Sequence, residues 1–274
     1  MAAELFKNKE FSEVYNKHMI PMSSKVVDLI LTYVEDKMGK PFKLAVDVGC
    51  GTGNSTRKLA AHFQEVIGAD TSESQLNVAR SCTSENNITY ILSPSESLPL
   101  EDNSVDIINA SLAVHWFDVE KFMQEAARVL KPGGCLALSS WLLKTEIYYK
   151  DHSETLTNIF NEAVRHISKY SVKILEHLKS EYETIFEAVP FSDKERINDI
   201  LEIYPVTVTD LLGLIQALYI YQEFLEEDRK EALMFLQNVD KRFLDVLGEN
   251  DFHATMEVHL KHACVLACKP KLHA

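Results

Sequence analysis

Apolar positions follow two alternating spacings along residues 43–139. Short runs of mainly apolar residues alternate with segments whose apolar residues return every three or four positions. The runs predict strands at 43–48, 65–69, 88–92, 105–110 and 135–139, and the segments predict helices that start near Ser55, Ser74 and Asp118. Since these strands have no polar face and alternate with helices, they predict an α/β fold with a mostly parallel sheet and helices on both faces.

The pattern changes on either side of this region. Residues 23–34 have the spacing of an amphipathic helix, with Ser23 or Ser24 available as N-cap. Beyond Trp141, four long helical segments are predicted, and two extended runs could return to the sheet as its last strands. The helices are predicted at 153–168, 171–188, 209–225 and 228–247, and the extended runs at 196–204 and 256–268.

This organisation predicts a single domain with three parts. Residues 1–40 form an N-terminal helical segment over the active site, and residues 41–140 form a ligand-binding α/β core. Residues 141–274 form a helical cap, inserted in the C-terminal half, together with the last strands of the sheet.

Composition narrows the class of protein. The chain has 274 residues, of which 46% are hydrophobic and 25% charged, as in a globular protein with a full core. Its 28 basic and 41 acidic residues give a formal net charge of −13, which argues against nucleic acid as a partner. No apolar run approaches the roughly 20 residues that span a membrane, and the first residues are too polar for a signal peptide. We therefore expect a cytoplasmic protein without membrane insertion.

The five cysteines are scattered and form no CxxC pair. Their number and spacing predict free thiols, with neither a disulfide framework nor a metal site.

The strongest chemical signal is the sequence LAVDVGCGTGNS at residues 44–55, a predicted buried strand that runs into three glycines before a helix. Glycines allow a sharp turn and a close approach of a ligand to the backbone. A dinucleotide motif needs its third glycine at position 54, but Asn54 stands there and the glycine comes earlier, at Gly53. The spacing disfavours a nicotinamide oxidoreductase and favours a nucleoside with an amino-acid tail.

Two acidic residues lie at the ends of predicted neighbouring strands. Asp70 ends the second strand, where it could accept hydrogen bonds from ribose hydroxyls or act as N-cap of the next helix. Asp47, near the end of the first strand, could attract a ligand ammonium group or only cap the turn.

Five motifs in order resemble those of class I S-adenosylmethionine-dependent methyltransferases. They are VDVGCGTG at 46–53, GAD at 68–70, ESLPL at 96–100, VDII at 105–108 and AARVLKPGG at 126–134. The sequence SLAVHWFD at 111–118 is similar to the small-molecule branch that includes trans-aconitate methyltransferase. The ending ACVLACKP at 263–270 is similar to the last strand of that branch.

The resemblance implies a Rossmann-like sheet of seven strands, the last one antiparallel, and S-adenosylmethionine as cofactor. It places Asp70 at the ribose, while Ser95 and Glu96 lie beside the adenine. Pro94 stands where family members often carry an acid. The cofactor-binding residues implied in this way are Asp47, Gly49, Cys50, Gly51, Gly53, Asn54, Asp70, Ser95, Glu96 and Trp116.

Methyl transfer from a sulfonium needs alignment rather than a catalytic nucleophile. A carboxylate acceptor needs no base at neutral pH, whereas a phenol or an ammonium must first lose a proton. His115, which follows the fourth strand, is therefore the candidate catalytic residue, either as a base or as an aromatic wall that orients the ligand. Trp116 is interpreted as a wall of the cofactor pocket.

The acceptor is predicted to be a small molecule that is methylated on a carboxylate or hydroxyl oxygen, with an amine nitrogen as the alternative. No pair of arginines in the cap offers a clamp for a dicarboxylic acid. A non-catalytic module that binds S-adenosylmethionine is the second hypothesis, and the oligomeric state stays open. The candidate substrate-binding residues are Tyr15, His18, Trp141, Tyr148, Tyr149 and Tyr219.

Overall fold

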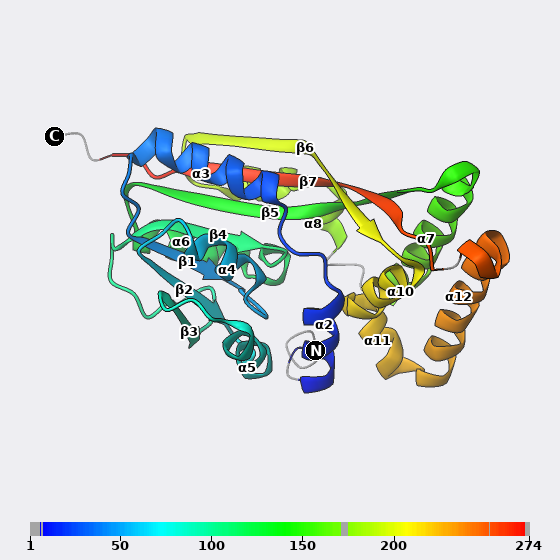
Figure 1. Ribbon diagram of the computed structural model, residues 1–274. Coiled ribbons are helices and arrows are strands. Elements are labelled where there is room, and N and C mark those ends of the chain that lie inside the picture. The colour runs from blue at the N-terminus through cyan, green and yellow to red at the C-terminus, as the bar shows by residue number, and fades with distance from the viewer. Residues whose placement is uncertain (1–5, 7, 171–174, 252, 272–274) are drawn as a thin grey trace. The chain divides into compact units, whose positions relative to one another are not determined.

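The computed structural model describes residues 6, 8–170, 175–251 and 253–271 (Figure 1). By its internal contacts the chain separates into two compact units. The sheet unit consists of Pro21–Trp141, His177–Ile200 and His262–Ala274, and the helical unit consists of Met1–Ile20, Leu142–Glu176 and Leu201–Lys261. Boundaries between the units fall after Ile20 and after Trp141. The three parts expected from the sequence stay a prediction.

Seven strands form one sheet in the order β3-β2-β1-β4-β5-β7-β6. β1 pairs in parallel with β2 and β4, β2 with β3, and β4 with β5. The five predicted strands and both extended runs are confirmed, and β5, β6 and β7 continue from one unit into the other. The strands are β1 (Leu44–Val48), β2 (Glu65–Asp70), β3 (Ile88–Leu92), β4 (Val105–Ser111), β5 (Leu130–Tyr148), β6 (Asp193–Val206) and β7 (Met256–Cys268).

The last strand, β7, is antiparallel to its neighbour β5. Gly133 donates a backbone hydrogen bond to Lys269, whose own N–H donates to Gly134, each at 2.9 Å. Such reciprocal bonds are the pattern of antiparallel neighbours. The end of β7 is therefore antiparallel to the start of β5, as the resemblance implies.

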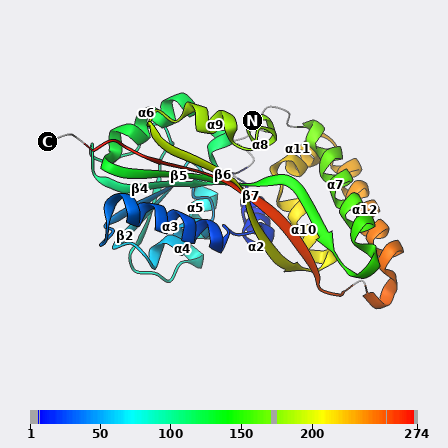
Figure 2. The same cartoon turned by 90° about the horizontal axis from the view of Figure 1, so that it is seen from above.

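Helices cover both faces of the sheet. Figure 2 shows α3 and α4 on one face and α6 and α9 on the other. The central strands between these layers carry side chains without solvent exposure, such as Ala45, Val46, Ile107 and Ile108. These helices are α3 (Ser24–Met38), α4 (Asn54–Ala60), α5 (Glu73–Cys82), α6 (Val119–Val129) and α9 (Glu183–Ala188), with a 3₁₀ turn η1 (Val114–Trp116).

Three helices of the sheet unit begin at side-chain caps. Ser23, Ser72 and Asp118 each accept a hydrogen bond from the backbone N–H three residues further along. Short polar side chains stabilise a helix start in this way because the first N–H groups have no partner within the helix. The predicted starts are therefore confirmed to within about one residue.

The helices beyond Trp141 differ from the prediction at two points. The helix predicted over 209–225 is divided at Leu218, whose ψ of 128° is extended. The single helix predicted at 171–188 is wrong, because Glu181 and Tyr182 have positive φ angles and separate α8 (Leu175–Lys179) from α9. Part of that prediction, residues 171–174, lies outside the described residues. The helices of the helical unit are α2 (Lys9–His18), α7 (Ser153–Ile167), α10 (Val208–Ala217), α11 (Tyr219–Glu227) and α12 (Arg229–Asp251), with 3₁₀ turns η2 (Lys150–His152) and η3 (Ser168–Tyr170).

None of the described helices combines the length and the apolar character that crossing a bilayer requires.

A buried carboxylate joins three strands of the sheet unit. Asp106 on β4 is only 4% exposed, and its Oδ2 accepts hydrogen bonds from the backbone N–H groups of Lys43 and Leu44 at 2.6 and 3.0 Å. Its Oδ1 accepts one from the Lys131 ammonium of β5 at 2.5 Å. Removing the carboxylate would leave a cation and two N–H groups without their partner.

We therefore expect Asp106→Ala to lower the free energy of unfolding by about 3–5 kcal/mol, the cost of breaking a buried ion pair. Urea denaturation measures this loss. Lys121→Ala, which removes the exposed Lys121–Asp118 pair, is the control and should unfold like the parent protein. Equal stability of Asp106→Ala and the control would contradict the assignment.

Candidate active site

Hydrogen bonds join the turn after β1 to the end of β2. Gly49, Gly51 and Gly53 all have positive φ angles, of 67°, 55° and 79°. The N–H groups of Gly49 and Cys50 donate to Ala69 O, and Gly51 N–H donates to Asp70 Oδ2 at 2.8 Å. Positive φ is accessible to glycine at little cost, so three glycines allow the backbone to turn sharply here.

Two of these glycines also make room for protein atoms. A Cβ on Gly49 would lie 2.6 Å from Ala113 Cβ, and one on Gly53 would overlap the hydroxyl of Tyr90. We interpreted the missing side chains as space for a ligand. At these two positions the structure shows that they admit the loop after β4 and a side chain of β3.

Asp47 is fully buried behind the turn. Its Oδ2 accepts hydrogen bonds from the hydroxyls of Ser55 and Thr56, both at 2.6 Å, and its Oδ1 accepts one from Asn109 Nδ2 at 2.7 Å. Burial raises the pKa of this carboxyl, and the three hydrogen bonds oppose that rise. Asp47 thus joins β1 to α4 and β4, while its contact with a ligand stays a prediction.

Asp70 closes β2 beside the turn. Its Oδ1 accepts the Ser72 N–H at 2.8 Å, and its Oδ2 holds the Gly51 amide. Burial raises the pKa of the Asp70 carboxyl, while the backbone hydrogen bonds act in the opposite direction. The alternative interpretation of Asp70 as N-cap is wrong, because Ser72 occupies that position in α5.

The remaining cofactor candidates lie in the same unit. Cys50 is buried, and its Sγ lies against Gly68, while Asn54 begins α4 and accepts a hydrogen bond from Arg57 at 2.7 Å. Ser95 is 6% exposed in the segment after β3. Glu96 accepts the Asp118 N–H at the start of α6, at 2.9 Å. Hydrogen bonds within the fold therefore hold the segments after β2 and β3, to which the resemblance assigns the ribose and the adenine.

His115 lies in the 3₁₀ turn that follows β4. Its ring centroid is 5.4 Å from that of Trp116, and its Nδ1 is buried with no hydrogen-bond partner among the described residues. Burial lowers the pKa of His115 to about 3, and the nearby His177 adds to the effect. The imidazole is therefore neutral at physiological pH and has little tendency to take up a proton.

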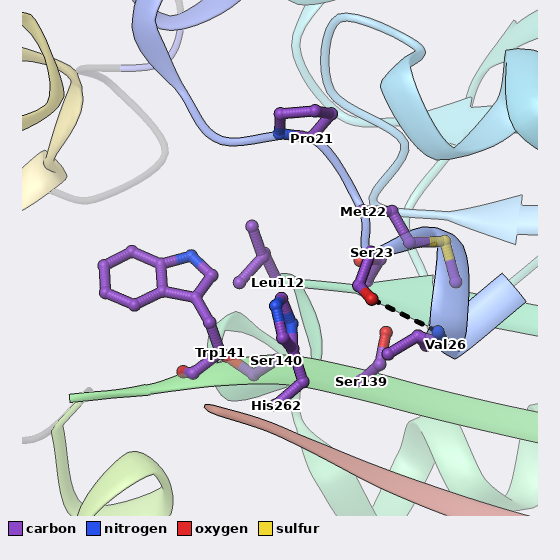
Figure 3. A pocket seen from close by; sticks show the side chains of 10 residues that line it. Pro21, Met22, Ser23, Val26, Leu112, Ser139, Ser140, Trp141 and His262 are labelled. Atoms are coloured by element: carbon purple, nitrogen blue, oxygen red, sulfur yellow. Dashed lines mark hydrogen bonds between the residues drawn. The ribbon is translucent and has the colours of Figure 1, made fainter. Parts of the chain in front are cut away.

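A hollow lies at the carboxyl end of β4 and β5 (Figure 3). The space in it that a water-sized molecule can occupy is only about 10 Å³. Leu112, in the loop after β4, has a φ of 57° and donates its N–H to Ser139 O at 2.8 Å. A leucine at positive φ is strained, and such strain is concentrated at functional sites. The lining residues are Pro21, Met22, Ser23, Val26, Ser111, Leu112, Ser139, Ser140, Trp141 and His262.

Of the candidate substrate residues, Trp141 lines this hollow and the other five lie in the helical unit. His18 packs against Gly213 of α10, where a Cβ would overlap its imidazole ring. Tyr15 contacts the ring of Phe11, edge to face. Tyr148 is 45% exposed and hydrogen-bonds Glu146, Tyr149 lies under the Lys150 ammonium, and Tyr219 hydrogen-bonds Glu223.

Sequence reasoning missed Ser23, Leu112, Ser139 and His262, which also line the hollow. These residues come from four separate parts of the chain, and of the four only Leu112 lies in a motif, SLAVHWFD at 111–118. Ser139 lay in a predicted strand, but only the pairing of Ser111 with Ser139 shows that it lies beside the loop after β4.

A sheet of this order, with a glycine turn and an acidic residue at neighbouring strand ends, defines a nucleoside-binding α/β fold. Residues 46–138 match the family model described as a methyltransferase domain. Residues 46–138 of the chain therefore form a methyltransferase domain, and S-adenosylmethionine is its cofactor.

Relatives and solved structures agree with this assignment. A Dictyostelium discoideum protein with a provisional methyltransferase name is 26% identical over 75% of both chains. CRG1 of Saccharomyces cerevisiae, named as a probable S-adenosylmethionine-dependent methyltransferase, is 31% identical over 48% of this chain and 46% of its own length. A methyltransferase structure from Anaeromyxobacter dehalogenans has the same fold, with a TM-score of 0.64 and 21% identity over 89% of this chain and 97% of its own. The match with CRG1 thus spans less than half of that relative.

The close packing of Gly49 generates a prediction with a matched control. Gly39 has a similar φ of 71°, but a Cβ there would contact nothing within 4 Å. Alanine at either position strains the backbone, and only at Gly49 does it also meet Ala113. We expect Gly49→Ala to lose about 1–3 kcal/mol more unfolding free energy than Gly39→Ala, the cost of overpacking.

Gly49→Ala should also lose affinity for S-adenosylmethionine in calorimetric titration, while Gly39→Ala keeps it. Equal affinities in the two variants would contradict a role of this turn in binding.

The half-buried imidazole of His115 predicts a pH dependence of stability. The pKa of His115 is about 3 in the folded protein, against about 6.5 in an unfolded chain. Between these values the unfolded chain binds the proton, so this residue lowers stability as the pH falls from about 6.5 toward 3. We expect the unfolding free energy of His115→Gln to fall less steeply between pH 7 and 4 than that of the parent protein. The exposed His62 supplies the control, His62→Gln, whose slope should equal the parent's; an unchanged slope in His115→Gln would refute the prediction.

Proposed function

We propose that the protein transfers a methyl group from S-adenosylmethionine to a small-molecule acceptor in the cytoplasm, without a nucleic-acid partner. The observation that carries the proposal is the turn of three positive-φ glycines, hydrogen-bonded through the Gly51 amide to Asp70. The buried hydroxyl oxygen of Thr52, in the same turn, has no hydrogen-bond partner among the described residues and is available to a ligand. These groups suit a nucleoside with an amino-acid tail, and the net charge of −13 disfavours a polyanion.

Different residues of the sheet unit bind different parts of S-adenosylmethionine. In this proposal the Asp70 carboxylate accepts hydrogen bonds from the ribose hydroxyls. The glycine turn holds the amino-acid tail, and Ser95 and Glu96 flank the adenine. Asp47 keeps the turn in place through Ser55 and Thr56. Trp116 forms an apolar wall.

The chemistry then needs positioning rather than a nucleophile. When bound, S-adenosylmethionine supplies a methyl group on a sulfonium centre, which is already a good leaving group. Positioning of two reactants can provide about 7–11 kcal/mol of the barrier. His115 acts in this proposal as a neutral wall that orients the ligands, because an imidazole with a pKa of about 3 is a weak general base at neutral pH.

A carboxylate or hydroxyl oxygen is the proposed methyl acceptor. A carboxylate is favoured by the neutral His115, because it is already ionised at neutral pH and needs no base. An amine acceptor would need another residue to remove its proton. The aromatic residues of the helical unit, Tyr15, Tyr148, Tyr149 and Tyr219, remain predictions for acceptor contacts.

The competing function is a module that binds S-adenosylmethionine without turnover. Both functions predict binding, so calorimetric titration comes first, followed by a tritiated-methyl assay on fractionated metabolites. Binding without methylation of any fraction would favour the module, and absence of binding would refute both.

Asp70→Asn tests the binding site. Replacing a charged acceptor by a neutral amide weakens hydrogen bonds to the ribose, so we expect the Kd for S-adenosylmethionine to rise about 10–100-fold. Isothermal titration measures the Kd, and Glu73→Gln, an exposed acid in the next helix, should leave it unchanged. An unaltered Kd in Asp70→Asn would remove Asp70 from the site.

A further inference from the structure

Helix α4, which follows the glycine turn, begins without a side-chain cap. Its N-cap position is Gly53, which has no side chain to accept a hydrogen bond, whereas α3, α5 and α6 each begin at a capping side chain. The first N–H groups of a helix have no partner within it, so an uncapped start is prone to fray. The last residues of the turn therefore need support from another group.

Arg57 supplies this support. Its guanidinium group folds back from α4 over the turn, where Nη1 donates a hydrogen bond to Thr52 O at 2.8 Å and Nη2 donates one to Asn54 Oδ1 at 2.7 Å. The backbone N–H of Arg57 donates to Gly53 O at 3.0 Å. Because a guanidinium is planar, its donors fix the relative position of their acceptors. One arginine thus holds three consecutive residues of the turn.

The hydrogen bonds to the turn are also where the charge of Arg57 acts. Its guanidinium group forms no ion pair with any carboxylate among the residues that the structure describes. Hydrogen bonds from a charged donor are stronger than those between neutral groups. The positive charge therefore strengthens the attachment of Thr52 and Asn54 to α4.

Tyr90 supports the same turn from β3. Its ring lies across Gly68 of β2, where a Cβ would come within 2.6 Å of the ring, and its hydroxyl overlaps the place of a Cβ on Gly53. This hydroxyl also shares a hydrogen bond of 2.9 Å with Thr83. A Cβ on Gly53 would lie 2.9 Å from Nη1 of Arg57 as well. Arg57 and Tyr90 thus meet at Gly53, where the missing side chain leaves room for both.

The residues that Arg57 holds belong to the part of the turn that the proposed function gives to the amino-acid tail of S-adenosylmethionine. Thr52 carries the buried hydroxyl without a partner among the described residues, and its carbonyl is the one that Arg57 binds. Asp70 is attached separately, through the Gly51 amide. A shift of Thr52 and Asn54 would therefore disturb the tail and leave the contacts of the nucleoside in place.

We infer that Arg57 is a positioning residue for the methyl donor: by holding Thr52 and Asn54, it gives the turn the shape that receives the amino-acid tail. The inference rests on the proposed methyl transfer. Because the tail is bonded to the sulfonium sulfur, its position also sets the direction of the methyl group, and methyl transfer depends on that alignment. Arg57 acts through the turn, and Tyr90 limits how far the turn can move.

Two ligands that differ in the tail test the inference. Isothermal titration of the full chain gives the Kd of S-adenosylhomocysteine and of 5′-methylthioadenosine, which has a methyl group in place of the tail. Arg57→Met keeps an extended side chain and removes both hydrogen bonds. We expect the Kd for S-adenosylhomocysteine to rise about 10–100-fold and that for 5′-methylthioadenosine to stay within about 2-fold. A merely structural role would change both Kd values by the same factor.

A conservative variant and a matched control accompany this measurement. Arg57→Lys keeps the charge but cannot reach both acceptors, so we expect a rise of about 3–10-fold for S-adenosylhomocysteine alone. Arg242→Met removes a guanidinium group that donates to Glu162 in the helical unit, and it should leave both Kd values unchanged. Thermal unfolding verifies that the variants fold, and Arg57→Lys decides the test if Arg57→Met does not fold.

The outcomes separate this inference from the proposed function. An unchanged Kd for S-adenosylhomocysteine in a folded Arg57 variant, or an equal rise for both ligands, overturns the inference while the proposed function stands. Equal affinity of the parent protein for both ligands also overturns it, because the turn would then not hold the tail. A parent protein that binds neither ligand refutes the proposed function, and the inference with it.

Discussion

The hydrogen bond from the Gly51 amide to Asp70 connects the turn after β1 to the end of β2, and the rest of the site depends on this connection. It is possible because β1 and β2 are parallel neighbours, so that their carboxyl ends lie at one edge of the sheet. On the other side of β1, Asp47 reaches Asn109 of β4. Buried carboxylates thus hold the turn from both sides before any ligand binds, and this rigidity is what an alignment reaction requires.

The electrostatics of the sheet unit fit chemistry without a protein base. The imidazole of His115, in the turn after β4, is half-buried next to an aromatic ring and stays neutral, because desolvation disfavours its charged form. The buried polar atoms without a partner among the described residues include a hydroxyl in the glycine turn, the Nδ1 of the neutral His115, and a hydroxyl and an indole N–H in the hollow. These groups form hydrogen bonds rather than move protons, which agrees with a methyl donor that is already activated.

The elements of the α/β region could be predicted because local pattern and tertiary role coincide there. Strands β1 and β4 are buried on both faces, so most of their residues are apolar and the strands are recognisable, although Asp47, Asp106 and Asn109 are polar. Helix starts at Ser23, Ser72 and Asp118 have side-chain caps that the sequence displays. The second half was predicted less well, because the breaks at Leu218 and Tyr182 come from backbone angles of residues that carry no turn signal.

The sequence by itself determined the class of the cofactor site, because the glycine turn and Asp70 are contiguous motifs whose chemistry depends on residue type and local spacing. Only the tertiary structure decided what Gly49 and Asp47 contact, the protonation state of His115 and the existence of the hollow. Each of these depends on strand register and burial, which bring together residues as far apart as Ser23, Leu112, Ser139 and His262. Strand register and side-chain burial cannot be predicted from any single segment of the chain, because both arise only when the strands pair.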